Sequence, residues 1–327
     1  MINSDTEICK KLNLLINSLP PHDVCRFLRL NQLDFYYATY CANGIPLEVK
    51  QSCGEYFRNS IKDVRLAVRT IAFLNDLLKR EGIEYVYVKT YRPIPYAPSD
   101  IDILIRDKDF EHFIRLLNTY GFKIVQRGVE VRCFKKNMTR IDVYSSIIYA
   151  GIAFEIIDQI FSKRTYVKFL GDYNILIPSP ELDALVVLLH DVLGHKTMNY
   201  LDYHYIKYYL LSNPANKTVL EFLHSMARGA DLIKRCIALF LSLERKGAFE
   251  NIKDFPIMFT PPLLLSMMID FSPRKKILYS SSFLVDVFLR FYNFYKDAIP
   301  EKLKRIVQVA LFYYKLLIGD RHTSWRP

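Results

Sequence analysis

The sequence predicts an α+β fold in which a small mixed β-sheet core is flanked by N-terminal helices and a C-terminal helical domain. Apolar residues recur at three- and four-residue steps up to about residue 80, which is typical of helices. Between residues 83 and 178 the pattern changes to short apolar runs and alternation, which favours strands. From Ser179 onward the helical pattern returns. We therefore expect a helical region at 1–82 packing on the core, an α/β core at 83–178 and a helical domain at 179–327.

The predicted elements follow one another along the chain. The last N-terminal helix ends at Glu81-Gly82, and Asp107 is expected to cap a helix that closes near Gly121. Ser179-Pro180-Glu181 combines a cap residue, a first-turn proline and a first-turn acid, and it opens the C-terminal helices. Strands are expected at 83–88, 101–105, 122–126, 129–134, 140–145 and 174–177. Further helices are expected at 154–161, 182–193, 201–211, 219–227, 232–243, 283–295 and 303–318.

Composition narrows the class of protein. The 327 residues are 51% hydrophobic, which is enough for a sizeable core and excludes wholesale disorder. A net charge of +11 favours polyanionic partners such as nucleotides, nucleic acid or a membrane surface. We expect no membrane span, because uncharged stretches such as Pro256–Ile269 are shorter than a spanning helix. Asp5 and Glu7 precede any apolar run, so no secretory signal is expected and the predicted location is cytoplasmic.

The cysteines are scattered and form no Cys-x-x-Cys pair, so a zinc site is not expected. Reduced thiols in a cytoplasmic protein are the expected state, and the intracellular disulfides of thermophiles are the alternative. The six positions are Cys9, Cys25, Cys41, Cys53, Cys133 and Cys236.

Three aspartates carry the strongest chemical signal. Asp100-Ile101-Asp102 opens an apolar strand, and because side chains alternate along a strand, the two carboxylates share one face. Two like charges side by side call for a cation, and a divalent ion with oxygen ligands is the natural choice. Asp142 lies between two β-branched residues on a later strand, so it faces away from the core as Asp102 does. If the two strands are neighbours, the three carboxylates form one cluster.

With these residues the chain resembles the DNA polymerase β-like nucleotidyltransferases, and within them the uncharacterised prokaryotic branch. That pattern has a strand ending in a small dipeptide, nine or more residues, an Asp-apolar-Asp pair and a later apolar-Asp-apolar strand. Val88-Lys89-Thr90, Asp100-Ile101-Asp102 and Ile141-Asp142-Val143 occupy these places, and the resemblance covers residues 83–178. The family's glycine-bearing dipeptide is Lys89-Thr90 here.

The resemblance implies metal-dependent transfer of a nucleotidyl group from an NTP such as ATP to an acceptor hydroxyl, with release of pyrophosphate. Asp100, Asp102 and Asp142 would be the catalytic residues and would bind Mg²⁺ or Mn²⁺. The nucleotide-binding residues would be Lys89, Thr90, Arg92 and Ser99. The acceptor would be an RNA, a protein side chain or a small molecule.

Two other functions remain open. The missing glycine is compatible with a non-catalytic nucleotide- or nucleic-acid-binding protein on the same core. A glycosyltransferase that holds a metal through Asp-x-Asp is disfavoured, because such a fold would place several βα units before the pair, whereas residues 1–80 have a helical pattern.

Weaker signals lie outside this trio. His190-Asp191, with His195 one turn later, resembles the dipeptide of metal-dependent phosphohydrolases. Simpler explanations are that these residues cap a helix, face the solvent or form a contact between the helical region and the sheet. Basic residues that precede Asp142 suit either phosphate binding or a solvated hairpin: Arg132, Lys135, Lys136 and Arg140. Further basic residues stand at 274–276 and 302–305. Aromatic runs at 291–296 and 312–315 suit core packing better than base stacking or anchoring at a membrane surface.

Overall fold

The computed structural model describes residues 4–41, 44–127, 130–149, 152–154, 156–170, 173–211 and 230–259. The chain divides into two compact units, Met1–Phe259 and Thr260–Pro327, and every described residue belongs to the first unit. The helices expected at 219–227, 283–295 and 303–318, the basic residues at 274–276 and 302–305 and the two aromatic runs lie outside the described residues. Within the described part, the α+β fold is confirmed, with N-terminal helices, a five-stranded mixed sheet and further helices.

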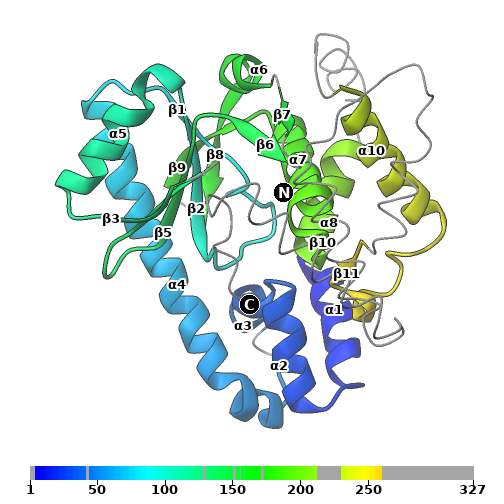
Figure 1. Ribbon diagram of the computed structural model, residues 1–327. Coiled ribbons are helices and arrows are strands. Elements are labelled where there is room, and N and C mark those ends of the chain that lie inside the picture. The colour runs from blue at the N-terminus through cyan, green and yellow to red at the C-terminus, as the bar shows by residue number, and fades with distance from the viewer. Residues whose placement is uncertain are drawn as a thin grey trace, which may run out of the picture. The chain divides into compact units, whose positions relative to one another are not determined.

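Four helices precede the sheet: α1 (Ser4–Ile16), α2 (Pro21–Leu30), α3 (Asp34–Tyr40) and α4 (Leu47–Arg80). The N-terminal half of α4 packs against α2 and α3, and its C-terminal half lies along the sheet (Figure 1). There Ala67, Ile71 and Leu74 are fully buried in the core that they share with the strands. The helix ends where Gly82 takes a φ of +65°, a conformation that glycine adopts without steric cost.

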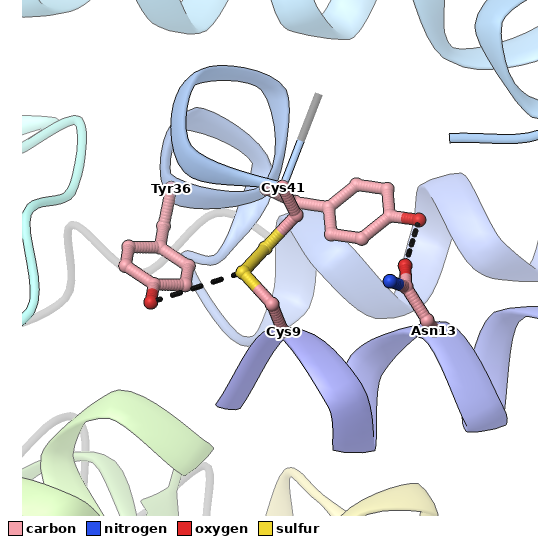
Figure 2. The surroundings of a disulfide bond; sticks show 5 residues. Cys9, Asn13, Tyr36 and Cys41 are labelled. Carbon is pink, nitrogen blue, oxygen red and sulfur yellow. Dashed lines mark hydrogen bonds between the residues drawn. A yellow bond between two sulfur atoms is a disulfide. The ribbon is translucent and has the colours of Figure 1, made fainter. Parts of the chain in front are cut away.

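Two disulfides join the N-terminal helices, so the expectation of reduced thiols is wrong for four cysteines. Cys9 in α1 is bonded to Cys41 at the end of α3, where the Tyr36 hydroxyl lies 4.0 Å from the Cys9 Sγ (Figure 2). Cys25 in α2 is bonded to Cys53 in α4. The partners stand 32 and 28 residues apart in the sequence, and only helix packing brings them together. Cys133 and Cys236 are buried thiols. The cytoplasmic location stays a prediction.

The central sheet has the strand order β1-β2-β5-β4-β3. Its strands are β1 (Tyr85–Tyr87), β2 (Asp100–Ile105), β3 (Lys123–Arg127), β4 (Val131–Phe134) and β5 (Arg140–Tyr144). β2 and β5 are parallel and the other neighbours are antiparallel, so the sheet is mixed. Helix α5 (Asp107–Thr119) follows β2 and ends before Gly121, as predicted, although its N-cap position is Arg106 rather than Asp107. The five strands confirm five of the predicted strands to within a few residues.

Two hairpins follow the sheet. One pairs β6 (Ile147–Tyr149) with β7 (Ile152–Phe154), and the other pairs β8 (Arg164–Phe169) with β9 (Tyr173–Pro178). Of these four strands, only β9 was predicted. The helix expected at 154–161 begins later, since Phe154 ends β7 and α6 spans Ile157–Ser162. The strand β8 escaped notice because its residues alternate between exposed and half-buried and include charged side chains, so it lacks the apolar signal of a core strand.

The region after Ser179 is mainly helical where the structure describes it, with one pair of two-residue strands. Its elements are α7 (Pro180–Leu189), the π-helical turn η2 (His190–His195), β10 (Thr197–Met198), α8 (Tyr200–Ile206), the π-helical turn η3 (Lys207–Leu211), α10 (Ala230–Arg245), the 3₁₀ turn η4 (Ile252–Asp254) and β11 (Ile257–Met258). Ser179 takes the N-cap position before Pro180, but its hydroxyl makes no capping hydrogen bond. No helix in the described ranges is both long and apolar enough to cross a membrane.

Candidate functional site

The three aspartates of the predicted cluster lie on neighbouring parallel strands. The register of β2 and β5 places Asp102 directly opposite Asp142 and Asp100 opposite Arg140. Because side chains alternate along a strand, Asp100, Asp102 and Asp142 share one face of the sheet. Ile101 and Ile103 occupy the opposite face and are fully buried. The strands are therefore adjacent, as the cluster requires.

Burial and mutual repulsion govern the ionisation of these carboxyl groups. The pKa of Asp142 is raised to about 6, first by burial and then by the charges of Asp102 and Glu130, while the charge of Arg140 opposes the shift. The pKa of Asp100 is also raised, first by burial and then by the charge of Asp102. The charge of Asp102 therefore makes ionisation of Asp100 and of Asp142 more costly.

Three basic side chains of the protein neutralise the cluster. The Lys89 Nζ lies 2.9 Å from Asp102 Oδ1, and the Arg132 Nε lies 3.2 Å from Asp142 Oδ1. Arg140 forms an ion pair with Asp100, and its Nε also lies 3.3 Å from Asp142 Oδ1. Its guanidinium group therefore spans two of the three carboxylates.

Tyr144 and Glu130 belong to the same cluster, although the sequence analysis did not single them out. The Tyr144 hydroxyl accepts a hydrogen bond of 3.1 Å from Lys89 Nζ. It also lies 2.8 Å from Asp102 Oδ1 and 2.7 Å from Glu130 Oε2. Tyr144 stands two residues after Asp142 on β5, so the alternation that places Asp142 also places this hydroxyl on the same face.

The loop after β1 carries the residues predicted to bind the nucleotide. Lys89 has a φ of +57°, in the left-handed region where non-glycine residues are uncommon. Lys89 therefore occupies a backbone conformation that glycine adopts more readily than lysine. The Thr90 hydroxyl accepts from the Asp102 N–H at 3.2 Å and lies 3.1 Å from the Val88 carbonyl oxygen. These bonds join the loop to β2, and the phosphate-binding role of Thr90 stays a prediction.

Arg92 and Ser99 lie at opposite ends of this loop. The Arg92 Nε donates a 2.7 Å hydrogen bond to Asp202 Oδ1, and the guanidinium group lies 4.9 Å from the centre of the Tyr205 ring. Burial alone would lower the pKa of Arg92, but Asp202 and the other acidic groups around it, Asp183 among them, together outweigh burial and the pKa is raised. The Ser99 hydroxyl is exposed and donates to Asp100 Oδ1 at 3.2 Å. Lys89 and Ser99 thus contact the aspartate cluster, whereas Arg92 is engaged with α8.

The His190-Asp191 dipeptide lies in the π-helical turn η2, close enough to Lys89 to feel its charge. Burial lowers the pKa of His190 and of His195, and the charge of Lys89 lowers both further. The two imidazole rings are 4.2 Å apart, centre to centre. Asp191 is buried, and its Oδ2 has no hydrogen-bond partner. The dipeptide therefore lies within the helical region, in electrostatic range of the loop that carries Lys89.

The donor set suits a hard divalent ion, but the side-chain positions do not coordinate one as they lie. Carboxylate oxygens are the ligands that Mg²⁺ prefers. Among the residues that the structure describes, no three His, Cys, Asp or Glu side chains are close enough to hold a metal ion. Lys89 and Arg140 are bound to these carboxylates, so coordination would require both cations to release them.

A separate cleft of about 850 Å³ lies between α1, α8 and the segment around η4. Tyr200, Tyr203 and Phe249 are among the residues that line it, with Lys11 and Lys207. None of the aspartates of the cluster lines this cleft.

Comparison with known proteins gives partial structural similarities. No protein-family model and no curated protein sequence matches the chain. The lincomycin-bound lincosamide antibiotic adenylyltransferase LnuA aligns with a TM-score of 0.33 and 14% identity, over 44% of this chain and 97% of its own. The antibiotic-resistance factor ANT(2'')-Ia aligns with a TM-score of 0.33 and 13% identity, over 58% of this chain and 96% of its own. An antigenic nucleotidyltransferase-like protein from Paracoccidioides brasiliensis aligns with a TM-score of 0.32 and 11% identity, over 57% and 94%.

Proposed function

We propose that this protein is a metal-dependent nucleotidyltransferase, which transfers a nucleotidyl group from an NTP to an acceptor hydroxyl and releases pyrophosphate. The observation that supports the proposal is the shared face of Asp100, Asp102 and Asp142 on adjacent parallel strands. The raised pKa values of Asp100 and Asp142 add to it, because burial and then the charge of Asp102 make both ionised forms costly unless a cation is near.

The residues of the chain divide into two charged sets with complementary tasks. Asp100, Asp102 and Asp142 would hold Mg²⁺ or Mn²⁺, which supplies charge neutralisation at the reacting phosphate when bound. Lys89 and Arg140, released from these carboxylates, would bind phosphate oxygens of the NTP. Asp142 lies directly opposite Asp102 on the neighbouring strand, so its carboxylate would be placed to help to deprotonate the acceptor hydroxyl.

A non-catalytic nucleotide-binding protein is the second candidate, and the ion pair between Lys89 and Asp102 favours it. The Lys89 side chain is only 6% exposed and supplies a positive charge to the cluster from within the chain. A site that neutralises its own carboxylates has less need of a divalent ion.

The test is to incubate the full-length protein and Mg²⁺ with each labelled NTP, together with total RNA, total protein and a small-molecule extract. We expect one acceptor fraction to become labelled, and we expect Asp100→Asn and Asp102→Asn to abolish labelling. Asp76→Asn, an exposed aspartate on α4, is the matched control and should label normally. Full labelling by both site variants would contradict the proposal. Calorimetry that shows nucleotide binding in EDTA, without labelling of any fraction, would favour the second candidate.

A further inference from the structure

Two buried aspartates of the helical region reach the loop that carries Lys89. Asp183 lies in α7 and Asp202 in α8, 94 and 113 residues after Lys89 in numbering. Both belong to the region beyond the core that the sequence predicts, and the sequence analysis gave neither of them a role. We infer that Asp183 and Asp202 are positioning residues of the candidate site, which hold the backbone of Lys89 so that its ammonium group meets Asp102. The inference rests on the proposed function, in which Lys89 binds the NTP.

Asp183 holds the amide side of Lys89. Its Oδ1 accepts a 2.8 Å hydrogen bond from the Lys89 backbone N–H, and its Oδ2 accepts one of 2.8 Å from the Tyr205 hydroxyl. The side chain is fully buried, so both of its oxygens depend on these protein donors. A buried carboxylate that receives two donors is fixed in orientation, and it fixes the N–H that it binds.

Asp202 holds the carbonyl side of Lys89 through Arg92. The Arg92 Nη1 donates a 3.0 Å hydrogen bond to the Lys89 carbonyl oxygen, while its Nε donates to Asp202. Asp202 is in turn held at the start of α8, where its N–H donates to Asn199 Oδ1 at 2.8 Å. Both peptide groups of Lys89 are therefore bound by partners anchored in the helical region.

The two attachments stabilise an otherwise unfavourable backbone conformation at Lys89. A non-glycine residue at a φ of +57° persists only where its surroundings fix it. Once the backbone is fixed, so is the direction of the side chain, and the Nζ lies 2.9 Å from Asp102 Oδ1. The candidate site therefore includes α7 and α8 as well as the predicted core at 83–178.

Hydrogen exchange of the Lys89 amide in the full-length protein tests the attachment directly. We expect Asp183→Ala to accelerate that exchange by roughly tenfold or more, since it removes the acceptor of a buried N–H. Asp183→Asn keeps an oxygen acceptor and should stay within about threefold of wild type. Asp34→Ala is the matched control, because Asp34 is equally buried and bonds Arg29 among the N-terminal helices, so it should leave the Lys89 amide unchanged. Unchanged exchange in Asp183→Ala would overturn the inference.

Nucleotide titration in Mg²⁺ tests whether the attachment acts through Lys89. We expect Asp183→Ala to weaken NTP binding by roughly tenfold in the wild-type background and to have no further effect in a Lys89→Met background. Asp202→Ala, which removes the acceptor of Arg92, should behave in the same way, and it provides the cycle if Asp183→Ala does not fold. Equal losses in both backgrounds would show a general effect on the fold and overturn the inference. If the variants show the expected exchange pattern but the wild-type protein binds no NTP, the attachment of Lys89 is supported and the proposed function is overturned. Failure of the attachment and failure of the proposed function therefore give different results.

Discussion

Replacing Asp142 with asparagine should remove a cost to folding that the wild-type carboxyl group acquires as the pH rises. Burial holds the pKa of Asp142 at about 6, above its ordinary value of 3.8, so its ionised form is less favourable in the folded chain than in the unfolded chain. Near pH 3 both states are protonated and the group costs nothing. Between about pH 4 and pH 6 the folded chain keeps a proton that the unfolded chain releases, so this group lowers stability as the pH rises. Asparagine does not titrate and escapes this cost.

The magnitude follows from the size of the shift. One pKa unit corresponds to about 1.4 kcal/mol, so a pKa raised from 3.8 to about 6 costs about 3 kcal/mol once the pH exceeds 7. By the same relation about 1 kcal/mol of that cost is already present at pH 4.5. The free energy of unfolding of Asp142→Asn, relative to wild type, should therefore increase by about 2 kcal/mol between pH 4.5 and pH 8.

The assay is urea unfolding followed by circular dichroism at the two pH values, in EDTA so that no divalent ion binds the carboxylates. Asp76→Asn on the exposed face of α4 is the matched control and should follow wild type at both pH values. A relative stability of Asp142→Asn that is the same at pH 4.5 and pH 8 would refute the reasoning, because it would mean that Asp142 ionises as easily in the folded chain as in water.

Three further outcomes are expected. Cys25→Ser should lower the free energy of unfolding by roughly 3–4 kcal/mol, because its disulfide with Cys53 closes a loop of 28 residues. Unfolding by urea without reductant measures the loss, and equal midpoints for variant and wild type would contradict the prediction. Thr70→Val should cost about 1–3 kcal/mol, because it removes the buried hydroxyl that accepts the Thr139 N–H at 2.9 Å, and a thermal melt at or above that of wild type would contradict it. Asn31→Ala should lower the melting temperature by several degrees, because the buried side-chain amide forms hydrogen bonds with three separate backbone groups. Calorimetry measures the melting temperature, and an unaltered transition would contradict the prediction.

The sheet could be predicted because its signal is local. Alternation of aspartate and isoleucine along residues 100–103 places the two aspartates on one face of the strand. Burial itself does not alternate, because every residue from Ile101 to Ile105 is buried, Asp102 included. The pairing of Asp102 with Asp142 was a conditional expectation, since no local pattern states which strands are neighbours; the parallel register of β2 and β5 satisfies the condition. The predicted residues Asp100, Asp102, Asp142, Lys89 and Ser99 meet at one cluster, while their chemical roles stay a prediction.

The parts that escaped prediction depend on contacts between distant segments. Nothing near Asp183 in the sequence indicates that its carboxylate binds the Lys89 amide, 94 residues earlier. Its neighbours in α7 are apolar, so an aspartate at a fully buried position was the signal available: a buried carboxylate needs donors from elsewhere. The disulfide between Cys9 and Cys41 was hidden for the same reason, since spacing along the chain does not reveal which helices pack together.

Helix α4 is long enough to pack against both the N-terminal helices and the sheet, so the stability of the sheet depends on the N-terminal region. Its 34 residues form a rod of about 50 Å. The disulfide of Cys53 joins one end to α2, and Ile71 and Leu74 pack the other end into the core beneath the sheet. A shortened protein that begins at Ile83 would strip one wall from the strands and leave their apolar side chains facing water. The aspartate cluster can therefore be transplanted to another protein only together with this rod or with a substitute that covers the same surface.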